Sequence, residues 1–354
     1  MPWFNPSEFT VLGTISAAQS TDLTYLKSTR KQSRVALSFM SNSYFPRTAL
    51  TQPPQNGAGK RILVTGANAG IGFWTSLQLA QRGAEVIMAC RNMEKAERAA
   101  ATIRSLLPHA TIKTLNLDVS SLESVAIAVD KLQGLERLDV LVANAGVVHA
   151  PSKRKESVDG LELVAATNYF GHFALSAGLL PVLERTPGSR VLTLGSLATL
   201  LVKPRINDLQ LRENYSSWRA YAQSKIMTQS FAFELDKRLK RSGSGVRSLC
   251  AHPGYSISGR TPFVAGINEP NSVKRVIDGI QAPFTQGKNH GAWPVVRAAL
   301  DPHTMDENGP IFFGPRALVK GSAVKQRPAR ITTDSGTARA IWSEAEQATK
   351  MSLL

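Results

Sequence analysis

Tyr221 and Lys225 carry a phenol and an ammonium four positions apart, a pair of side chains suited to proton transfer. On a helix this spacing places both side chains on one face. An isolated tyrosine has a pKa of about 10, and a nearby ammonium stabilises the tyrosinate and lowers that pKa. The pair therefore suits a general acid that protonates a carbonyl oxygen. A Tyr–Lys pair taken alone is more often an ordinary surface pair, so its interpretation depends on the residues that follow.

Ser196 lies 25 residues before Tyr221 and two residues after the apolar segment 191–194, which is typical of a buried strand. A hydroxyl at the end of a strand can hydrogen-bond a substrate oxygen and polarise its bond to carbon. Ser196 and Tyr221 together predict a site for the interconversion of an alcohol and a carbonyl group.

A glycine-rich turn at 65–72 contains Gly66, Gly70 and Gly72, with Asn68 and Ile71 between them. The apolar strand pattern 61–65 precedes the turn, and a helical pattern over 73–82 follows it. Backbone N–H groups in such a turn approach a pyrophosphate, and the start of the helix adds partial positive charge. The layout predicts a dinucleotide-binding loop, whereas a glycine triplet alone would indicate only a tight turn.

The end of the second predicted strand bears on the choice between NAD and NADP. A carboxylate there would accept hydrogen bonds from the adenosine ribose and favour NAD. This chain has Arg91 and Asn92 at that point and no acid. Arg91 can pair with a 2′-phosphate, so the sequence favours NADP, with NAD as the alternative.

Short apolar strands alternate with helical patterns from residue 60 onward. This alternation predicts an α/β fold, a Rossmann-type doubly wound parallel sheet with helices on both faces. We expect one domain over 60–350 and an N-terminal extension over 1–59. The expected strands are 61–65, 84–89, 111–115, 138–142 and 191–194, and the expected helices are 73–82, 93–107 and 121–133.

In the order of these motifs the sequence resembles the short-chain dehydrogenase/reductase family over about residues 60–350. The segments at 89–92, 168–173 and 252–254 resemble its retinol-dehydrogenase-like branch. The resemblance implies an NAD(P)-dependent oxidoreductase whose Lys225 also holds the nicotinamide ribose and whose Asn168 anchors a proton relay to Tyr221. It further implies that Asp118 contacts the adenine. The remaining cofactor-binding residues that it implies are Asn144, Gly146, Pro253 and Gly254.

The segment 255–294 is expected to form a substrate loop and lid. Its apolar residues suggest a small lipophilic aldehyde, ketone or alcohol as substrate. They are Pro262, Phe263, Val264, Val273, Ile277, Ile280, Pro283, Phe284 and Trp293.

Two other functions remain open. One is a non-catalytic dinucleotide sensor or scaffold, against which the complete Ser196, Tyr221 and Lys225 set argues. The other is an enzyme similar to protochlorophyllide reductase, against which the shortage of cysteines in the substrate region argues.

The chain has 354 residues, 43% of them hydrophobic, and a net charge of +16, values that suit a globular protein with a basic surface. The basic residues are scattered and match no nucleic-acid-binding motif, so we expect no nucleic-acid partner. His149 and His172 have no acids or cysteines at ligand spacing, which predicts no metal. No apolar run approaches the roughly 18 residues of a membrane helix, so no transmembrane segment is expected. A homodimer is compatible with the sequence.

Two cysteines, Cys90 and Cys250, indicate a reducing compartment, and a cytoplasmic location is the first expectation. Residues 1–59 contain only two acids, Glu8 and Asp22, and no sustained periodicity, and they end in a Pro- and Gly-rich linker. Such a segment is expected to be disordered or to target the protein to an organelle.

Overall fold

A computed structural model of the chain describes residues 56–354. The N-terminal extension is expected to be disordered or to target the protein to an organelle. Of its residues 1–59, only 56–59 lie within the described range, so these predictions fall outside it. The described chain begins beside the first helix, where the Gly57 N–H donates to the Arg82 carbonyl oxygen at 2.9 Å.

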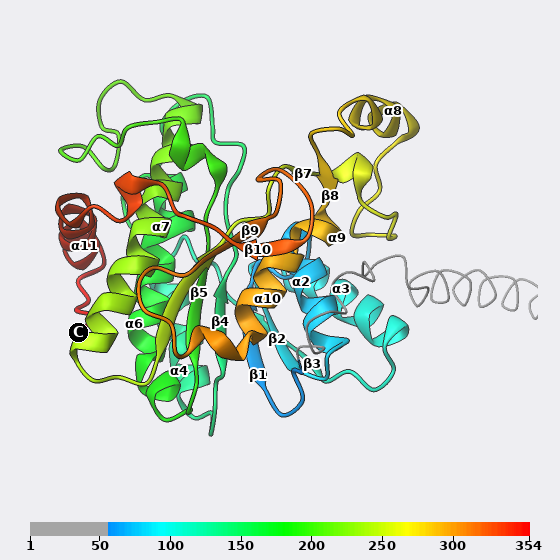
Figure 1. Cartoon of the computed structure of the whole chain (residues 1–354), viewed down its shortest axis with the longest axis horizontal. Helices are drawn as coiled ribbons and strands as arrows, with labels where there is room; N and C mark the ends of the chain where they lie inside the picture. Colours follow the sequence, from blue (N-terminus) through cyan, green and yellow to red (C-terminus); the bar gives the residue numbers. More distant parts are fainter. Residues whose placement is uncertain (1–55) are drawn as a thin grey trace, which may run out of the picture. The chain divides into compact units, whose positions relative to one another are not determined.

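An eight-stranded sheet runs through the described domain in the order β10-β9-β6-β5-β4-β1-β2-β3 (Figure 1). The strands from β3 to β9 are parallel, and only β10 runs antiparallel, along β9. The predicted Rossmann-type fold is confirmed. The strands are β1 (Arg61–Thr65), β2 (Glu85–Cys90), β3 (Ile112–Asn116), β4 (Val140–Ala143), β5 (Arg190–Leu194), β6 (Arg247–Ala251), β9 (Phe312–Pro315) and β10 (Ala323–Lys325).

Every residue of β4, β5 and β6 is buried, as is all of β1 beyond its first residue. Strands covered on both faces need apolar side chains on both, which explains the continuous rather than alternating apolar pattern. Two short strands, β7 (Ser256–Ile257) and β8 (Gln286–Gly287), form a separate parallel pair.

Helices cover both faces of the large sheet, with α2, α3 and α10 on one face and α4, α6 and α7 on the other (Figure 1). The α-helices are α2 (Gly70–Ala80), α3 (Met93–Leu106), α4 (Leu122–Gln133), α5 (Leu163–Ala165), α6 (Gly171–Glu184), α7 (Ser217–Arg241), α8 (Ser272–Ile280), α9 (Lys288–Gly291), α10 (Trp293–Leu300) and α11 (Ser335–Thr349). Shorter turns are the π-helix η4 (Ala166–Phe170) and the 3-10 helices η5 (Leu197–Leu200), η6 (Ser258–Arg260), η7 (Pro302–Thr304) and η8 (Arg330–Thr332).

The first helix differs from its prediction, because α2 begins at Gly70 rather than near Phe73. Because glycine has a low helix propensity, the prediction began the helix after the last glycine of the turn. In the structure Gly70, Ile71 and Gly72 form the first turn of α2, so the glycine turn and the helix start overlap.

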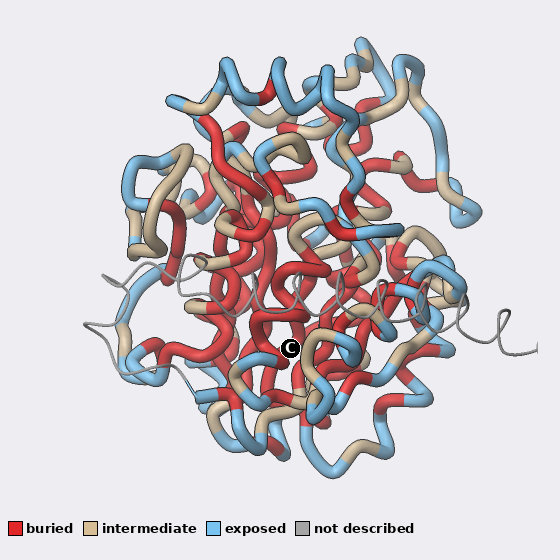
Figure 2. The backbone as a smooth tube through the Cα atoms, turned by 90° about the vertical axis from the view of Figure 1, so that its right-hand side faces the viewer, coloured by how far each residue is buried: buried red, intermediate tan, exposed pale blue. Residues whose placement is uncertain are grey.

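The core is richest in aromatic side chains between α6, α7 and α11. Trp342 of α11 packs against Phe173 of α6 and Phe231 of α7, with ring centroids 5.3 and 5.9 Å apart. The Arg238 guanidinium lies 3.9 Å from the centre of the Trp342 ring. Figure 2 shows the buried backbone running through the middle of the domain, with exposed segments at its rim.

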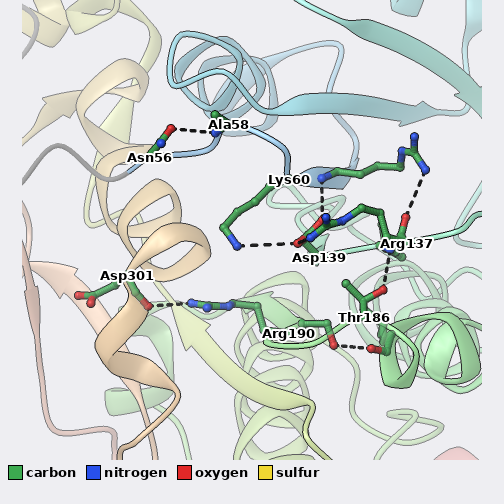
Figure 3. Close-up of polar contacts among 12 residues, drawn as sticks. Asn56, Ala58, Lys60, Arg137, Asp139, Thr186, Arg190 and Asp301 are labelled. Atoms are coloured by element: carbon green, nitrogen blue, oxygen red, sulfur yellow. Dashed lines mark hydrogen bonds and ion pairs between the residues drawn. The ribbon is translucent and has the colours of Figure 1, made fainter.

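A group of charged side chains closes the amino ends of the central strands (Figure 3). The Asp139 carboxylate is 1% exposed and accepts hydrogen bonds from the Arg61 backbone N–H, at 2.8 Å, and from the Arg137 guanidinium. Arg190 of β5 donates to the Asp301 carbonyl oxygen at 2.9 Å. These contacts connect the first residues of β1 and β5 to neighbouring loops at the edge of the sheet opposite the site described below.

One continuous helical segment, Leu163–Glu184, is long and apolar enough to cross a membrane by length and composition alone. Polar residues such as Asn168 and His172 interrupt its apolar residues, so a search for an uninterrupted apolar run does not identify it. Its apolar window is 72% buried within the domain, a pattern also produced by core helices.

Candidate active site

The candidate site lies at the carboxyl edge of four adjacent parallel strands, β1, β4, β5 and β6. The predicted site segments follow the last residues of these strands, which are Thr65, Ala143, Leu194 and Ala251. Parallel strands that neighbour one another bring their carboxyl ends to one edge, where doubly wound folds bind ligands.

The glycine turn meets the requirements of a phosphate-binding loop. Gly66 and Gly70 have φ values of +64° and +58°, which side chains other than glycine rarely adopt. The N-cap of α2, Ala69, provides no side-chain hydrogen bond, so the first N–H groups of the helix are not capped by that residue. A helix start of this kind is suited to bind a phosphate oxygen.

The Thr65 hydroxyl joins this turn to the segment after β4. It accepts hydrogen bonds from the backbone N–H groups of Asn144 and Ala145, at 2.9 and 2.8 Å. The Asn144 amide in turn donates to the Thr65 carbonyl oxygen at 2.6 Å. Asn144 therefore fixes the shape of the turn through its side chain and its backbone.

Tyr221 and Ser196 come together as predicted. Tyr221 lies in the first turns of α7, and its hydroxyl donates to the Ser196 hydroxyl oxygen at 3.2 Å. Ser196 is the N-cap of η5, where its Oγ accepts the Ala198 N–H at 3.2 Å. Two hydroxyl groups thus meet at one point of the sheet edge, where a substrate oxygen could contact both.

The expected lowering of the Tyr221 pKa is not seen. Burial raises the pKa of Tyr221 above its usual value, and the Ser196 hydrogen bond offsets this only in part. The physical reason lies in Lys225, which shares the helix face but whose Nζ donates to the Leu194 carbonyl oxygen at 2.8 Å. Lys225 is 7% exposed, and burial lowers its own pKa to about 8.

Asn168 lies in the π-helical turn η4, between the segment after β4 and helix α7. Its Oδ1 accepts the Val147 N–H at 2.7 Å, and its Nδ2 donates to the Ser224 hydroxyl at 2.8 Å. Gly146 packs against the same amide, since a Cβ at Gly146 would lie 3.0 Å from the Asn168 Oδ1. Ser224 was missed from sequence, although its position directly before Lys225 was a usable signal.

His172 was not predicted as a site residue from the sequence. Its ring connects the glycine turn to the π-helix η4. Its Nε2 lies 2.9 Å from the Thr65 Oγ1, and its Nδ1 lies 3.3 Å from the Asn168 carbonyl oxygen. Because Thr65 Oγ1 already accepts two N–H groups, its proton can go to His172 Nε2 at 2.9 Å or to the Val142 carbonyl oxygen at 3.4 Å. Burial lowers the pKa of His172 to about 4, so the ring is neutral at pH 7.

Arg91 and Asp118 form an ion pair 3.6 Å apart at the ends of β2 and β3, and the Arg91 side chain is 76% exposed. Asp118 also accepts hydrogen bonds from the N–H and the hydroxyl of Ser120. Asn92 has a structural task, because its Oδ1 caps α3 by accepting the Lys95 N–H at 2.8 Å. The structure thus places Arg91 and Asp118 together and Asn92 beside them.

Pro253 and Gly254 form the turn after β6. Gly254 has a φ of +65°, and a side chain there would collide with the Val319 backbone. The Pro253 carbonyl oxygen accepts hydrogen bonds from Ser256 and Gln286, at 2.8 and 2.9 Å. This turn therefore fixes the segment that leads into β7.

Both cysteines are free and buried, one at each flank of the site. Cys90 ends β2 beside the glycine turn and Cys250 lies in β6 near Lys225, and burial raises the pKa of each thiol to about 11. Among residues 56–354, no group of three or more His, Cys, Asp or Glu side chains could hold a metal ion.

A family model for short chain dehydrogenases matches residues 60–270, which include the glycine turn, Ser196, Tyr221 and Lys225. The chain belongs to the short-chain dehydrogenase/reductase family. It is an NAD(P)-dependent oxidoreductase of the retinol-dehydrogenase-like branch.

The chain is 35% identical to retinol dehydrogenase 13 of Homo sapiens over 81% of its own length and 83% of that protein. It is 39% identical to human retinol dehydrogenase 12 over 68% and 73% of the two chains. A crystal structure of an uncharacterized protein from Mycobacterium paratuberculosis matches with a TM-score of 0.68 and 34% identity, covering 85% of this chain and 97% of that one.

The short-chain dehydrogenase site fits a dinucleotide on the evidence of its own geometry. A Cβ at Gly72 would collide with the Gly66 carbonyl and the Asn144 amide, so the backbone at the start of α2 stays close to the strand edge. The residues that would hold the pyrophosphate, as expected from the sequence, are Gly66, Asn68, Gly70, Ile71 and Gly72.

Proposed function

We propose that the chain uses NADPH to reduce a lipophilic aldehyde or ketone, with Tyr221 as the general acid. The observation that carries this proposal is the 3.2 Å contact between the hydroxyl groups of Tyr221 and Ser196. It lies at the sheet edge that also carries the glycine turn, so a proton donor and a cofactor site face one region.

Each site residue has a distinct task in this proposal. Bound NADPH supplies the hydride. Ser196 hydrogen-bonds the substrate oxygen and Tyr221 protonates it, which stabilises the charge that develops there. Lys225 holds the nicotinamide ribose, and Asn168 anchors the chain of groups that returns a proton to Tyr221.

Arg91 supports NADPH as the cofactor. It extends from the end of β2 with most of its side chain exposed, and no carboxylate follows β2. Its guanidinium already pairs with Asp118, which lies just after β3, so a bound 2′-phosphate would compete with Asp118 for the guanidinium. An Arg–phosphate contact is charge-assisted and therefore among the stronger hydrogen bonds.

Exposed apolar side chains near the site support a lipophilic substrate. Residues that are 51–72% exposed follow or neighbour each site segment. They are Val148, Leu200, Leu201, Trp218 and Tyr255. Such side chains are suited to cover an apolar molecule held next to Ser196 and Tyr221.

The segment 255–294 adds a second apolar group, which supports its proposed role as substrate loop and lid. Phe263 and Phe284 are 56% and 69% exposed, and α8 exposes four aliphatic residues between them. The four are Val273, Val276, Ile277 and Ile280, a spacing that places them on one face of the helix. Val264, predicted to line the same pocket, is instead buried.

The test is NADPH oxidation by the purified full chain with aliphatic aldehydes, aromatic ketones, steroids and quinones. We expect turnover with apolar carbonyls and little with charged ones. NADPH binding without consumption would support a sensor or scaffold, and a bound pigment would support an enzyme similar to protochlorophyllide reductase.

The location of the protein and the role of residues 1–59 belong to the same proposal. We propose a cytoplasmic enzyme whose extension is dispensable for catalysis. A reporter fused to residues 1–59 tests this in a eukaryotic cell, where import into an organelle would instead identify the extension as a targeting segment. We also propose that the chain forms a homodimer, and light scattering of the full chain tests its oligomeric state.

A further inference from the structure

The glycine turn provides no charged side chain to the pyrophosphate of a dinucleotide. Residues 65–72 contain only Thr, Gly, Ala, Asn and Ile, and Arg91 lies at the adenosine end. Backbone N–H groups and the start of α2 offer partial charges only. Any cationic contact to the pyrophosphate would therefore come from another segment of the chain.

The short helix α9 packs on α2 close to this turn. The Gln78 side chain of α2 donates to the Asn289 carbonyl oxygen at 2.7 Å. Gly291 lies against the turn itself, since a Cβ there would be 2.8 Å from Ile71 Cδ1 and in collision with the Ser256 hydroxyl. Ile71 and Ser256 are thus both immediate neighbours of α9.

Lys288, the first residue of α9, is tied to the same segment as Ser256. The residue between Ser256 and Ser258, Ile257, is extended, with φ −125° and ψ 154°, so the two serines lie on one side of the chain. Lys288 Nζ donates to the Ser258 Oγ at 2.7 Å, and its backbone N–H donates to Thr261. The ammonium is therefore bonded to the serine on the same side of the chain as Ser256, and Ser256 and Ile71 both lie beside Gly291 of α9.

The surroundings of Lys288 favour an anionic ligand. Burial lowers its pKa, the neighbouring Lys274 lowers it further, and Asp278 opposes the change. Asp278 is already occupied, by the Gly259 N–H at 2.7 Å and by Lys274 at 3.1 Å. A half-buried cation next to a second cation is stabilised by an added negative charge.

We propose that Lys288 binds the pyrophosphate of the dinucleotide and supplies the cationic contact that the glycine turn lacks. This inference rests on the proposed cofactor site, and it adds a residue from the segment after β6 to that site. Lys288 then contributes to affinity for NADPH and NADH alike, whereas Arg91 distinguishes between them.

The test is equilibrium binding to the full chain, by calorimetry, of NADPH, NADH, ADP-ribose and adenosine 2′-phosphate. We expect Lys288→Met to weaken the first three roughly tenfold or more, because a charge-assisted contact is lost, and to leave adenosine 2′-phosphate unchanged. Arg275→Met removes a positive charge from an exposed position of the neighbouring helix α8, and we expect it to change all four affinities by less than about threefold. Thermal unfolding shows whether each variant is folded.

The outcomes separate this inference from the proposed function. If Lys288→Met binds all four ligands as the parent chain does, or if Arg275→Met weakens them as strongly, the inference is wrong while the cofactor site stands. Loss of adenosine 2′-phosphate binding in Lys288→Met would place Lys288 at the adenosine end and also overturn it. Failure of the unmodified chain to bind any dinucleotide would instead reject the proposed function.

Discussion

Lys225 and Leu194 are joined by a hydrogen bond of 2.8 Å from the Lys225 Nζ to the Leu194 carbonyl oxygen. This bond attaches helix α7 to the end of β5, two residues before Ser196. It also gives the buried ammonium a partner other than the Tyr221 phenol. The charge of Lys225 is therefore held at the strand edge, where we propose that the nicotinamide ribose binds.

Lys225→Ala is expected to weaken both cofactor affinity and turnover. Losing a charge-assisted contact reduces NADPH affinity roughly tenfold or more, and a misplaced nicotinamide slows the reaction further. Titration of NADPH and steady-state rates measure the two effects. Lys237→Ala, on the exposed side of the same helix, is the control and should change neither. Lost turnover with unchanged affinity would exclude the ribose role.

Tyr221→Phe is expected to reduce turnover by about 10²–10⁴, because the proton donor is removed. NADPH binding should stay within about twofold, since the phenol hydroxyl contacts Ser196 rather than the glycine turn. Stopped-flow absorbance gives the rate of the chemical step directly. Near-normal rates in this variant would reject Tyr221 as the acid.

Arg91→Ala is expected to weaken NADPH binding roughly ten- to a hundredfold and to leave NADH almost unchanged. Asp118→Asn breaks the same ion pair from the other side and keeps the guanidinium. If Asp118 contacts the adenine, that variant loses affinity for both cofactors equally. Equal losses for NADPH and NADH in Arg91→Ala would show that Arg91 does not bind the 2′-phosphate.

The stability of the domain is expected to fall in acid because of His172. Burial lowers its folded-state pKa from 6.5 to about 4. Between these values the unfolded chain binds a proton that the folded chain does not, so stability is lost as pH falls from about 6.5 to 4, by at most about 3 kcal/mol. Urea unfolding at several pH values measures this loss. His172→Gln should have a shallower pH dependence, and an unchanged slope would assign the loss to other groups.

Removal of residues 1–55 is expected to leave folding, NADPH affinity and turnover close to those of the full chain. All predicted site residues lie between Gly66 and Gly254, and the first strand starts at Arg61. Comparing the melting temperature and rates of both proteins tests this. An insoluble or inactive truncated protein would show that the extension completes the core or an interface.

The parts of the fold that depend on local pattern could be predicted from the sequence. Strand β1 and the glycine turn are local, because an apolar run, a set of φ-permissive glycines and a helix follow one another directly. The hydrogen bond between Thr65 and His172 joins residues 107 positions apart, and nothing in the sequence around either residue indicates the other as its partner. Such pairs depend on how helix α6 packs against the sheet, which the sequence pattern does not specify.

The same limit explains the Tyr221 pKa. The four-residue spacing correctly places Tyr221 and Lys225 on one face of α7, but the direction of a long flexible side chain depends on its nearest acceptor. That acceptor is the Leu194 carbonyl, which comes from another strand. Burial of both groups, rather than their mutual charge, then determines the pKa values of Tyr221 and Lys225.

Because Cys90 and Cys250 are buried, their chemical labelling would measure local opening of the folded domain. A thiol reacts with alkylating reagents only as an exposed thiolate, and neither cysteine meets that condition in the folded state. Labelling of each therefore requires a transient opening of the strand that carries it. Labelling of Cys90 reports opening of β2, beside the proposed dinucleotide site, and labelling of Cys250 reports opening of β6, near Lys225. Mass spectrometry of the labelled peptides would measure the two opening rates separately in the unmodified protein.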